Sequence, residues 1–291
     1  MKDFFKYLVA ICMVVGAMSL QAQSFGVRAG LNYNTFNGPQ ENAGESYGIG
    51  GGFHFGINYS YHVSDLFSLV FEIGYTQNGT SYKYNGDSYF IIREDDYTVY
   101  EPGTREMELT ISNGYIMLPV VANYKLSKKF EVFGGAYANL LVSPTGSGKF
   151  YFKTSNTIVD GIDHIEFEQS LDYSYGSDEA LEGYTPSGDV ENGVYIDGNE
   201  VYFAQVAGAY YQHAEKKANL INSLDAGLVG GLNYFINRGF YAGVRFEYGL
   251  LDITDKRADA AISELDENNQ LIYRDDKDTH MGVNVSIGFR F

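Results

Sequence analysis

The sequence predicts an all-β fold, an eight-stranded antiparallel transmembrane β-barrel. Its 291 residues include 34 Gly, 26 Tyr and 20 Phe but only 5 Pro and no Trp, and a chain rich in aromatic residues favours strands. Eight segments alternate apolar residues with polar or small ones, which is the period of a strand with one apolar face. Their connections alternate between tight turns and long polar loops, as in a barrel whose strands cross a bilayer in about 9–11 residues each.

The eight alternating segments follow one another along the whole chain. They cover residues 25–34, 53–62, 67–76, 115–126, 129–142, 223–236, 239–251 and 283–291. The tight turns are HVSD, SKK and NRG, and the long loops are expected at about 35–47, 80–106, 143–218 and 252–279. Hairpins within these loops are expected to extend the barrel as a β-rich collar. A ring of ten strands stays open as the alternative, because residues 201–211 are long enough to join it.

Five charged residues within these segments set the register. They all stand opposite the apolar face, and they are Arg28, Glu72, Arg245, Glu247 and Arg290. An arginine on the lipid side costs about 2–4 kcal/mol near the bilayer midplane, so the apolar face is expected to be the outer one. The charges then form a polar network in the lumen with a structural role, because eight strands leave room for side chains but not for a channel.

Two further expectations concern the strands themselves. The last segment, 283–291, is expected to pair with the first, 25–34, because a closed ring leaves no strand edge unpaired at membrane depth. Pro119 stands in the middle of the fourth segment and cannot donate a hydrogen bond to a neighbouring strand. We therefore expect a β-bulge there, with Pro119 turned inward.

The first 22 residues have the layout of a secretory signal peptide. Lys2 and Lys6 precede an apolar run from Tyr7 to Leu20, and a short polar segment follows it. The single cysteine, Cys12, lies inside this leader. The mature domain, residues 23–291, is therefore expected to be an exported protein without disulfides.

The segment YIMLPVVANYKLSKKFEVFGGAYANLLV resembles the PorT-like outer-membrane β-barrel family of Bacteroidetes-type bacteria. The segments FGVRAGLNYN and VSIGFRF are similar to that family's first and last strands. The resemblance implies a bacterial outer-membrane location, with the amino terminus and the tight turns in the periplasm and the long loops outside the cell. It also implies that the barrel assembly machinery recognises an alternating terminal run, here Val285, Ile287, Phe289 and Phe291.

The long loops are acidic and contain further strand signals. Residues 143–218 hold 13 Asp and Glu against 4 Lys, and residues 252–279 hold 9 against 4 Lys and Arg. Such loops disfavour nucleic acid as a partner. Hairpins are expected around Asp197-Gly198 and in residues 262–274 and 158–168. No calcium-loop spacing accompanies these carboxylates, so neither a metal site nor a cofactor is predicted.

The sequence favours a non-enzymatic interaction or binding protein of the outer membrane. His280, with Asp278 two residues earlier, is the best placed histidine, but no Ser nucleophile and no GxSxG or HExxH motif accompanies it. The candidate binding surface in the loops is rich in tyrosine. It consists of Tyr173, Tyr175, Tyr184, Tyr195, Tyr202, Tyr210 and Tyr211.

Expected partners are outer-membrane lipid, the barrel assembly machinery and an unidentified surface or envelope protein. The alternative function is a passive structural or complex-anchoring barrel, including a component of protein secretion machinery. Exposed clusters of the loop tyrosines would favour binding, and scattered ones would favour the passive role.

Overall fold

A computed structural model describes residues 23–93, 98–154, 165–196 and 199–291. The predicted signal peptide lies outside these residues. No helix within the described ranges is long and apolar enough to cross a membrane. The described secondary structure consists of β-strands, and most of them belong to one large sheet.

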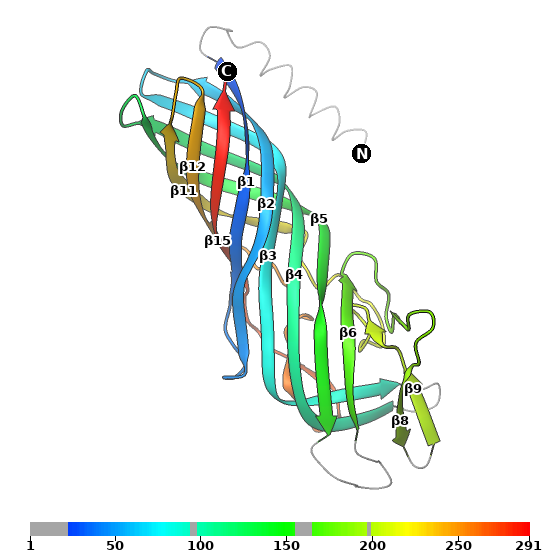
Figure 1. Ribbon diagram of the computed structural model, residues 1–291. Helices are drawn as coiled ribbons and strands as arrows, with labels where there is room; N and C mark the ends of the chain where they lie inside the picture. Colours follow the sequence, from blue (N-terminus) through cyan, green and yellow to red (C-terminus); the bar gives the residue numbers. More distant parts are fainter. Residues whose placement is uncertain (1–22, 94–97, 155–164, 197–198) are drawn as a thin grey trace, which may run out of the picture.

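Eight strands close into a ring (Figure 1). In ring order they are β1 (Gln23–Asn37), β2 (Glu45–His62), β3 (Phe67–Arg93), β4 (Thr98–Lys125), β5 (Phe130–Thr154), β11 (Leu224–Phe235), β12 (Phe240–Gly249) and β15 (Thr279–Arg290). All neighbouring pairs are antiparallel, and β15 pairs with β1 from Gly26 opposite Arg290 to Asn37 opposite Thr279. The predicted eight-stranded ring and its closure by the last strand are confirmed.

The ten-stranded alternative is not formed. Residues 201–211 contribute to β9 (Asn199–Phe203) and β10 (Val206–Ala207), which pair outside the ring. β9 pairs with β8 (Asn192–Ile196), and β10 lies between β6 (Glu166–Ser174) and β7 (Gly183–Tyr184). The segment is diverted because β5 and β11 are already hydrogen-bonded to each other and leave no gap for another pair.

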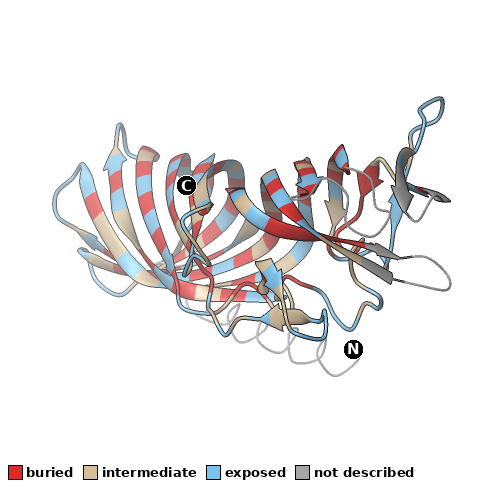
Figure 2. Ribbon diagram, turned by 90° about the horizontal axis from the view of Figure 1, so that it is seen from below, coloured by how far each residue is buried: buried red, intermediate tan, exposed pale blue. Residues whose placement is uncertain are grey.

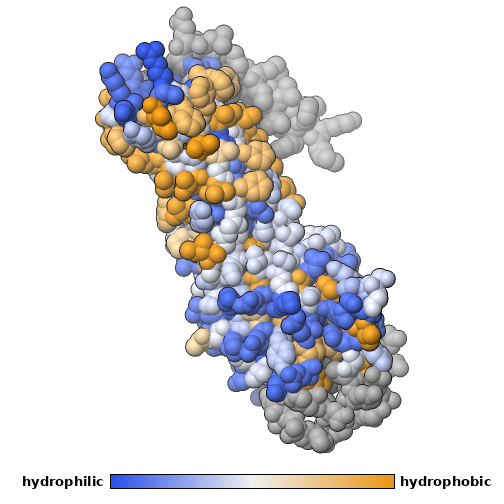
Figure 3. All heavy atoms as spheres, in the orientation of Figure 1, coloured by the Kyte–Doolittle hydropathy of each residue, from blue (hydrophilic) through white to orange (hydrophobic). Residues whose placement is uncertain are grey.

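An apolar band surrounds the half of the ring that carries the tight turns. Burial alternates along each strand, so that Phe25, Val27 and Leu31 are exposed while Arg28 and Asn32 are buried (Figure 2). Exposed apolar side chains gather over this half, and polar side chains cover much of the other half (Figure 3). The band identifies the lipid-facing surface, and the predicted register is correct.

The other half of the molecule is a collar built by β3, β4 and β5. Each of these strands is 25–28 residues long and continues past the apolar band. Residues 80–106, expected to be a loop, are therefore mainly a continuous ladder between β3 and β4. β6 extends the same sheet, and the predicted hairpin in residues 262–274 forms as β13 (Ala260–Leu265) and β14 (Leu271–Tyr273). The turn at Asp197-Gly198 and most of residues 158–168 lie outside the described residues.

Phenylalanine side chains hold the collar together. The ring of Phe167 lies 4.8 Å from that of Phe90 and 4.6 Å from that of Phe203, between centroids. Phe150 and Phe152 pack against the same cluster. Aromatic pairs at these distances contribute about 0.5–1.5 kcal/mol each beyond the area that they bury. The collar is therefore a packed continuation of the barrel.

Two β-bulges at the base of the collar change which residues point inward. In β5, Ser143 lies opposite Gly114 and Leu141 opposite Tyr115, so Val142 is an extra residue. Odd-numbered residues such as Tyr137 point inward below it, and even-numbered ones such as Phe150 point inward above it. The register of β2 shifts in the same way between Ile49 and His54, at the glycines of GIGGGF.

Pro119 is turned inward as predicted, but the expected bulge at this position is wrong. β4 keeps one register with β5 across the proline, which lies opposite Tyr137. On the β3 side the register also continues, from Val120 opposite Phe71 to Met117 opposite Gly74, with the two pairings between them missing. The absent N–H is therefore accommodated by a local gap in the ladder and needs no extra residue.

Candidate ligand-binding site

Four charged side chains form a central charge cluster inside the ring: Arg28 in β1, Glu72 in β3, and Arg245 and Glu247 in β12. Nε of Arg28 lies 2.5 Å from one carboxylate oxygen of Glu72, and Arg245 lies 3.1 Å from the other. Arg245 also lies 3.8 Å from the carboxylate of Glu247. Two positive and two negative charges therefore meet on the face opposite the apolar band.

Arg290, the fifth charge expected in the lumen, pairs with a residue that sequence reasoning missed. Its two terminal nitrogens donate to the carboxylate of Glu131 at 3.0 and 2.9 Å. Asn123 and Asn233 donate to the same carboxylate at 2.7 and 3.2 Å. The signal was present in the sequence, because Glu131 stands between two apolar residues of its strand, as Glu72 does.

His280 lies inside the ring, where it faces a carboxylate other than the expected Asp278. Its Nδ1 lies 3.4 Å from the hydroxyl of Tyr137 and 3.7 Å from the carboxylate of Asp225. Asn139 donates to the same carboxylate at 3.2 Å. This set is a third polar layer of the lumen, and it contains no Ser or Cys to act as a nucleophile.

The lumen at the level of the central charge cluster is filled. The open space among Arg28, Glu72, Asn233 and Arg245 measures about 30 Å³, the volume of about one water molecule. A ring of eight strands is expected to be packed with side chains in this way. A small molecule therefore has no room to bind or react at this level of the lumen.

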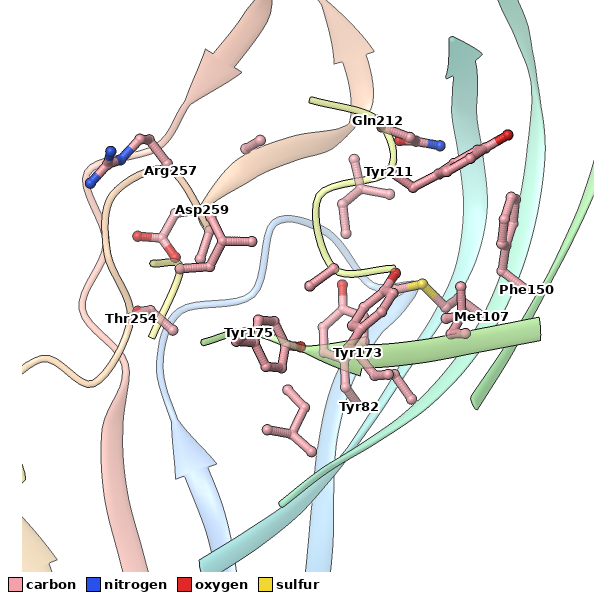
Figure 4. A pocket seen from close by; sticks show the side chains of 18 of the residues that line it. Tyr82, Met107, Phe150, Tyr173, Tyr175, Tyr211, Gln212, Thr254, Arg257 and Asp259 are labelled. Carbon is pink, nitrogen blue, oxygen red and sulfur yellow. The ribbon is translucent and has the colours of Figure 1, made fainter. Parts of the chain in front are cut away.

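The collar encloses a cavity of about 230 Å³ on the far side of these polar layers (Figure 4). An apolar cavity of about 150 Å³ can accommodate benzene, so this one has room for a ring with a short substituent. Its apolar walls come from β1, β4, β5, β6 and the segment before β11, and include Phe36, Leu109, Ile111, Phe150, Leu171 and Ile221.

Tyrosines form a second part of the cavity wall. Six of them line it: Tyr47, Tyr82, Tyr89, Tyr173, Tyr175 and Tyr211. Burial raises the pKa of Tyr89 and Tyr173 to about 12. These hydroxyl groups therefore stay protonated and can act as hydrogen-bond donors or acceptors to a polar group in the cavity.

The tyrosines expected to form a binding surface do not make one exposed cluster at the loop tips. Tyr173, Tyr175 and Tyr211 line the cavity, and Tyr210 is buried beside it with its hydroxyl donating to the carbonyl of Tyr175 at 2.9 Å. Tyr184 and Tyr202 are exposed. The side chain of Tyr195 lies outside the described part of the chain.

Carboxylates gather on one side of the cavity. Burial and the neighbouring Asp276 raise the pKa of Asp259 to about 8, and the same two causes raise that of Asp278 to about 6. Arg274 offsets part of this charge, because it lies 3.1 Å from Asp276 and 3.7 Å from Glu45. Among the described residues no group of three or more His, Cys, Asp or Glu side chains could hold a metal ion.

A second, more peripheral cavity of about 400 Å³ adjoins the first. The two share the lining residues Gln212, His213, Leu220, Arg257 and Leu271. The outer one is also lined by Glu215 and Lys217, whose side chains are exposed. The shared residues therefore mark an entrance from solvent to the inner cavity.

A closed ring with a lipid-facing apolar band and buried charges defines an integral membrane β-barrel. The chain belongs to the family of outer membrane protein beta-barrel domains, whose profile matches residues 21–255. The protein is therefore a β-barrel of the bacterial outer membrane. A comparison with curated proteins found no match.

Several solved outer-membrane proteins are similar in fold. The attachment invasion locus protein Ail of Yersinia pestis is 10% identical, with 94% of this chain and 100% of that chain covered and a TM-score of 0.35. OprG of Pseudomonas aeruginosa is 10% identical, with 93% and 96% covered and a TM-score of 0.35. Neisserial surface protein A is 11% identical, with 93% and 98% covered and a TM-score of 0.32. These likenesses bear on neither the ligand nor the partners of this chain.

Proposed function

We propose that the protein is a non-enzymatic binding barrel of the outer membrane, and that its collar holds a small molecule. The observation that carries this proposal is the cavity of about 230 Å³. Ligand sites combine mostly apolar walls with a few placed polar groups, and this cavity has phenylalanine, leucine and tyrosine walls with charged groups at particular points. A barrel that served only as a membrane anchor would not require it.

The proposed orientation places the collar and its acidic loops outside the cell and the tight turns in the periplasm. Residues 115–142, which carry the resemblance to the PorT-like family, form the membrane part of β4, one tight turn and the membrane part of β5. Under this proposal the acidic loops also meet a surface or envelope protein, and nucleic acid is excluded by charge. Val285, Ile287, Phe289 and Phe291 are proposed as the signal read by the assembly machinery.

A passive structural or complex-anchoring barrel, as in protein secretion machinery, is the second candidate. It is favoured by the three polar layers of the lumen, which brace the ring and need no ligand. The two candidates differ in what they predict for the collar. Only the binding role requires its cavity to be occupied.

Native mass spectrometry of the barrel purified from outer membranes tests the binding role. Ala207 lines the cavity and is buried, so Ala207→Phe places a ring in the space that a ligand would occupy. Ala136 lies opposite the exposed Val120 and Leu228, so Ala136→Phe adds the same ring on the lipid face as a control. A small molecule retained by the parent and by Ala136→Phe, but lost from Ala207→Phe, supports binding. A parent that retains nothing favours the passive barrel.

A further inference from the structure

One arginine of the cavity has no acidic partner among the residues that the structure describes. Arg105 in β4 lines the cavity and is only 9% exposed. One terminal nitrogen donates to the carbonyl of Tyr89 at 2.8 Å, and Nε has no hydrogen-bond partner. None of the ion pairs between described residues includes Arg105.

The other two arginines that line the cavity differ in this respect. Arg257 lies 2.5 Å from the carboxylate of Asp255, and Arg274 lies within 4 Å of both Glu45 and Asp276. Every arginine of the lumen is likewise paired with a glutamate. Arg105 is therefore the exception among the buried arginines of the described chain.

The surroundings of Arg105 supply little compensation for its charge. Its guanidinium stands over the ring of Phe150, 5.2 Å from the centroid, and burial lowers its pKa, with the phenols of Tyr89, Tyr173 and Tyr82 nearby. Arginine remains charged in proteins, so burial cannot neutralise it. A buried cation without a partner is costly, and such groups are found where a ligand supplies the missing charge.

Asp259, one of the acidic groups of the cavity, lies away from Phe150. In Figure 4, Thr254, Arg257 and Asp259 gather on one side of the pocket and Met107 and Phe150 on the other. Arg105 stands over the ring of Phe150. Glu45 is engaged by Arg274 and by the hydroxyl of Tyr82 at 3.2 Å. The space beside Arg105 is therefore bounded by aromatic side chains and a single uncompensated cation.

We propose that the cavity binds a small monoanion with an apolar or aromatic body, whose carboxylate pairs with Arg105. This inference rests on the proposed binding function and names the ligand class for the same site. The cavity volume limits the body to about one ring and a short chain, which excludes a two-chain lipid. A carboxylate accepts two parallel hydrogen bonds from a guanidinium, so it matches both the charge and the free donor.

Calorimetric titration of the purified, folded barrel with two probes of the same shape tests the proposal. The probes are 3-phenylpropanoate, which carries a carboxylate, and 3-phenylpropanamide, which is neutral. A hydrogen bond to a charged group contributes about 1.5–3 kcal/mol, so the parent is expected to bind the carboxylate about tenfold or more tightly. Equal affinity for the two probes would overturn the anion preference and leave the binding cavity standing. Failure of both probes to bind would overturn both.

Variants of Arg105 separate a binding role from a structural one. Arg105→Met keeps an apolar stem of similar length and is expected to lose the preference for the carboxylate, whereas Arg105→Lys keeps a charge and is expected to retain part of it. Lys149→Met removes an exposed cation from the outer face of β5 and should leave the preference unchanged. The urea midpoint of Arg105→Met should equal or exceed that of the parent, because an unpaired buried charge has been removed. A lower midpoint with an unchanged preference would identify Arg105 as a structural brace and refute the proposal.

Discussion

Replacing Glu72 by Gln should destabilise the barrel more than any other single change in the lumen. Glu72 is the carboxylate shared by Arg28 at 2.5 Å and Arg245 at 3.1 Å. In the parent two arginines balance two glutamates. The variant leaves both guanidiniums facing each other with only Glu247 nearby, 3.8 Å from Arg245.

The expected loss of free energy of unfolding is about 3–5 kcal/mol, the range measured when one partner of a buried ion pair is removed. We expect the upper end of that range, because two pairs break at once. Arg245→Leu should be milder, since Glu72 then keeps Arg28. Adding Arg28→Met to Glu72→Gln restores neutrality and should recover part of the loss.

Urea titration of the barrel in lipid vesicles, followed by circular dichroism, measures these differences, because the chain has no Trp for fluorescence. Glu108→Gln is the matched control: it removes an exposed carboxylate that lies 2.5 Å from Lys83, and solvent-exposed pairs contribute little to stability. If the free energy of unfolding of Glu72→Gln lies within about 1 kcal/mol of that of the Glu108→Gln control, water solvates the lumen arginines and the charge cluster does not have the expected role in stability.

Three further outcomes are expected. Planar-bilayer recordings should show no stable conductance, because only about 30 Å³ is open at the central charge cluster, and steady large channels would contradict the filled lumen. The protection of residues 252–279 against hydrogen exchange, corrected for the intrinsic pH dependence of amide exchange, should fall as the pH rises towards about 8 and level off above it: burial beside Asp276 raises the pKa of Asp259 to about 8, so the folded loop binds its proton more tightly than the unfolded loop and loses stability when the proton leaves. Asp259→Asn should abolish this pH dependence, and an unchanged profile would show that another group is responsible. Phe291→Ala should reduce outer-membrane insertion, measured by cell fractionation, while refolding in detergent stays near normal; equal failure in both assays would make Phe291 a stability residue.

The membrane half of the fold could be predicted from the sequence because its physics is local. Lipid on one side and a narrow lumen on the other impose a period of two, and charges such as Arg28 and Glu72 fix which face is which. The sequence did not show which charged side chains pair with each other across the lumen. Arg290 meets Glu131, and His280 meets Asp225, because strands that are not adjacent in the ring face each other across the lumen only when the ring closes.

The hairpin signals of the long loops predicted a β-rich collar, but the collar's long strands and its cavity were not predictable in the same way. Residues 80–106 were expected to form a loop, and Arg105 lies within them. Its position depends on the long β3–β4 ladder and on loop segments packed from the other side, none of which has a local pattern that specifies the contact. The sequence shows that the loops are rich in tyrosine, but composition cannot tell whether a tyrosine faces solvent or an internal space.

The bulges in β2 and β5 have a consequence for how related chains can vary in length. β4 carries Arg105 to the cavity with no bulge of its own, so its odd-numbered residues face inward all the way from Val121 to Arg105. Inserting one residue between Arg105 and Tyr115 would turn the arginine to the outer face, and inserting two would keep it inward but shift it by about 6–7 Å along the strand. In β2 and β5 a bulge at the base of the collar already switches which alternate residues face inward. Relatives that keep the ring are therefore expected to gain or lose residues in β4 in pairs, and to tolerate single changes at the bulges.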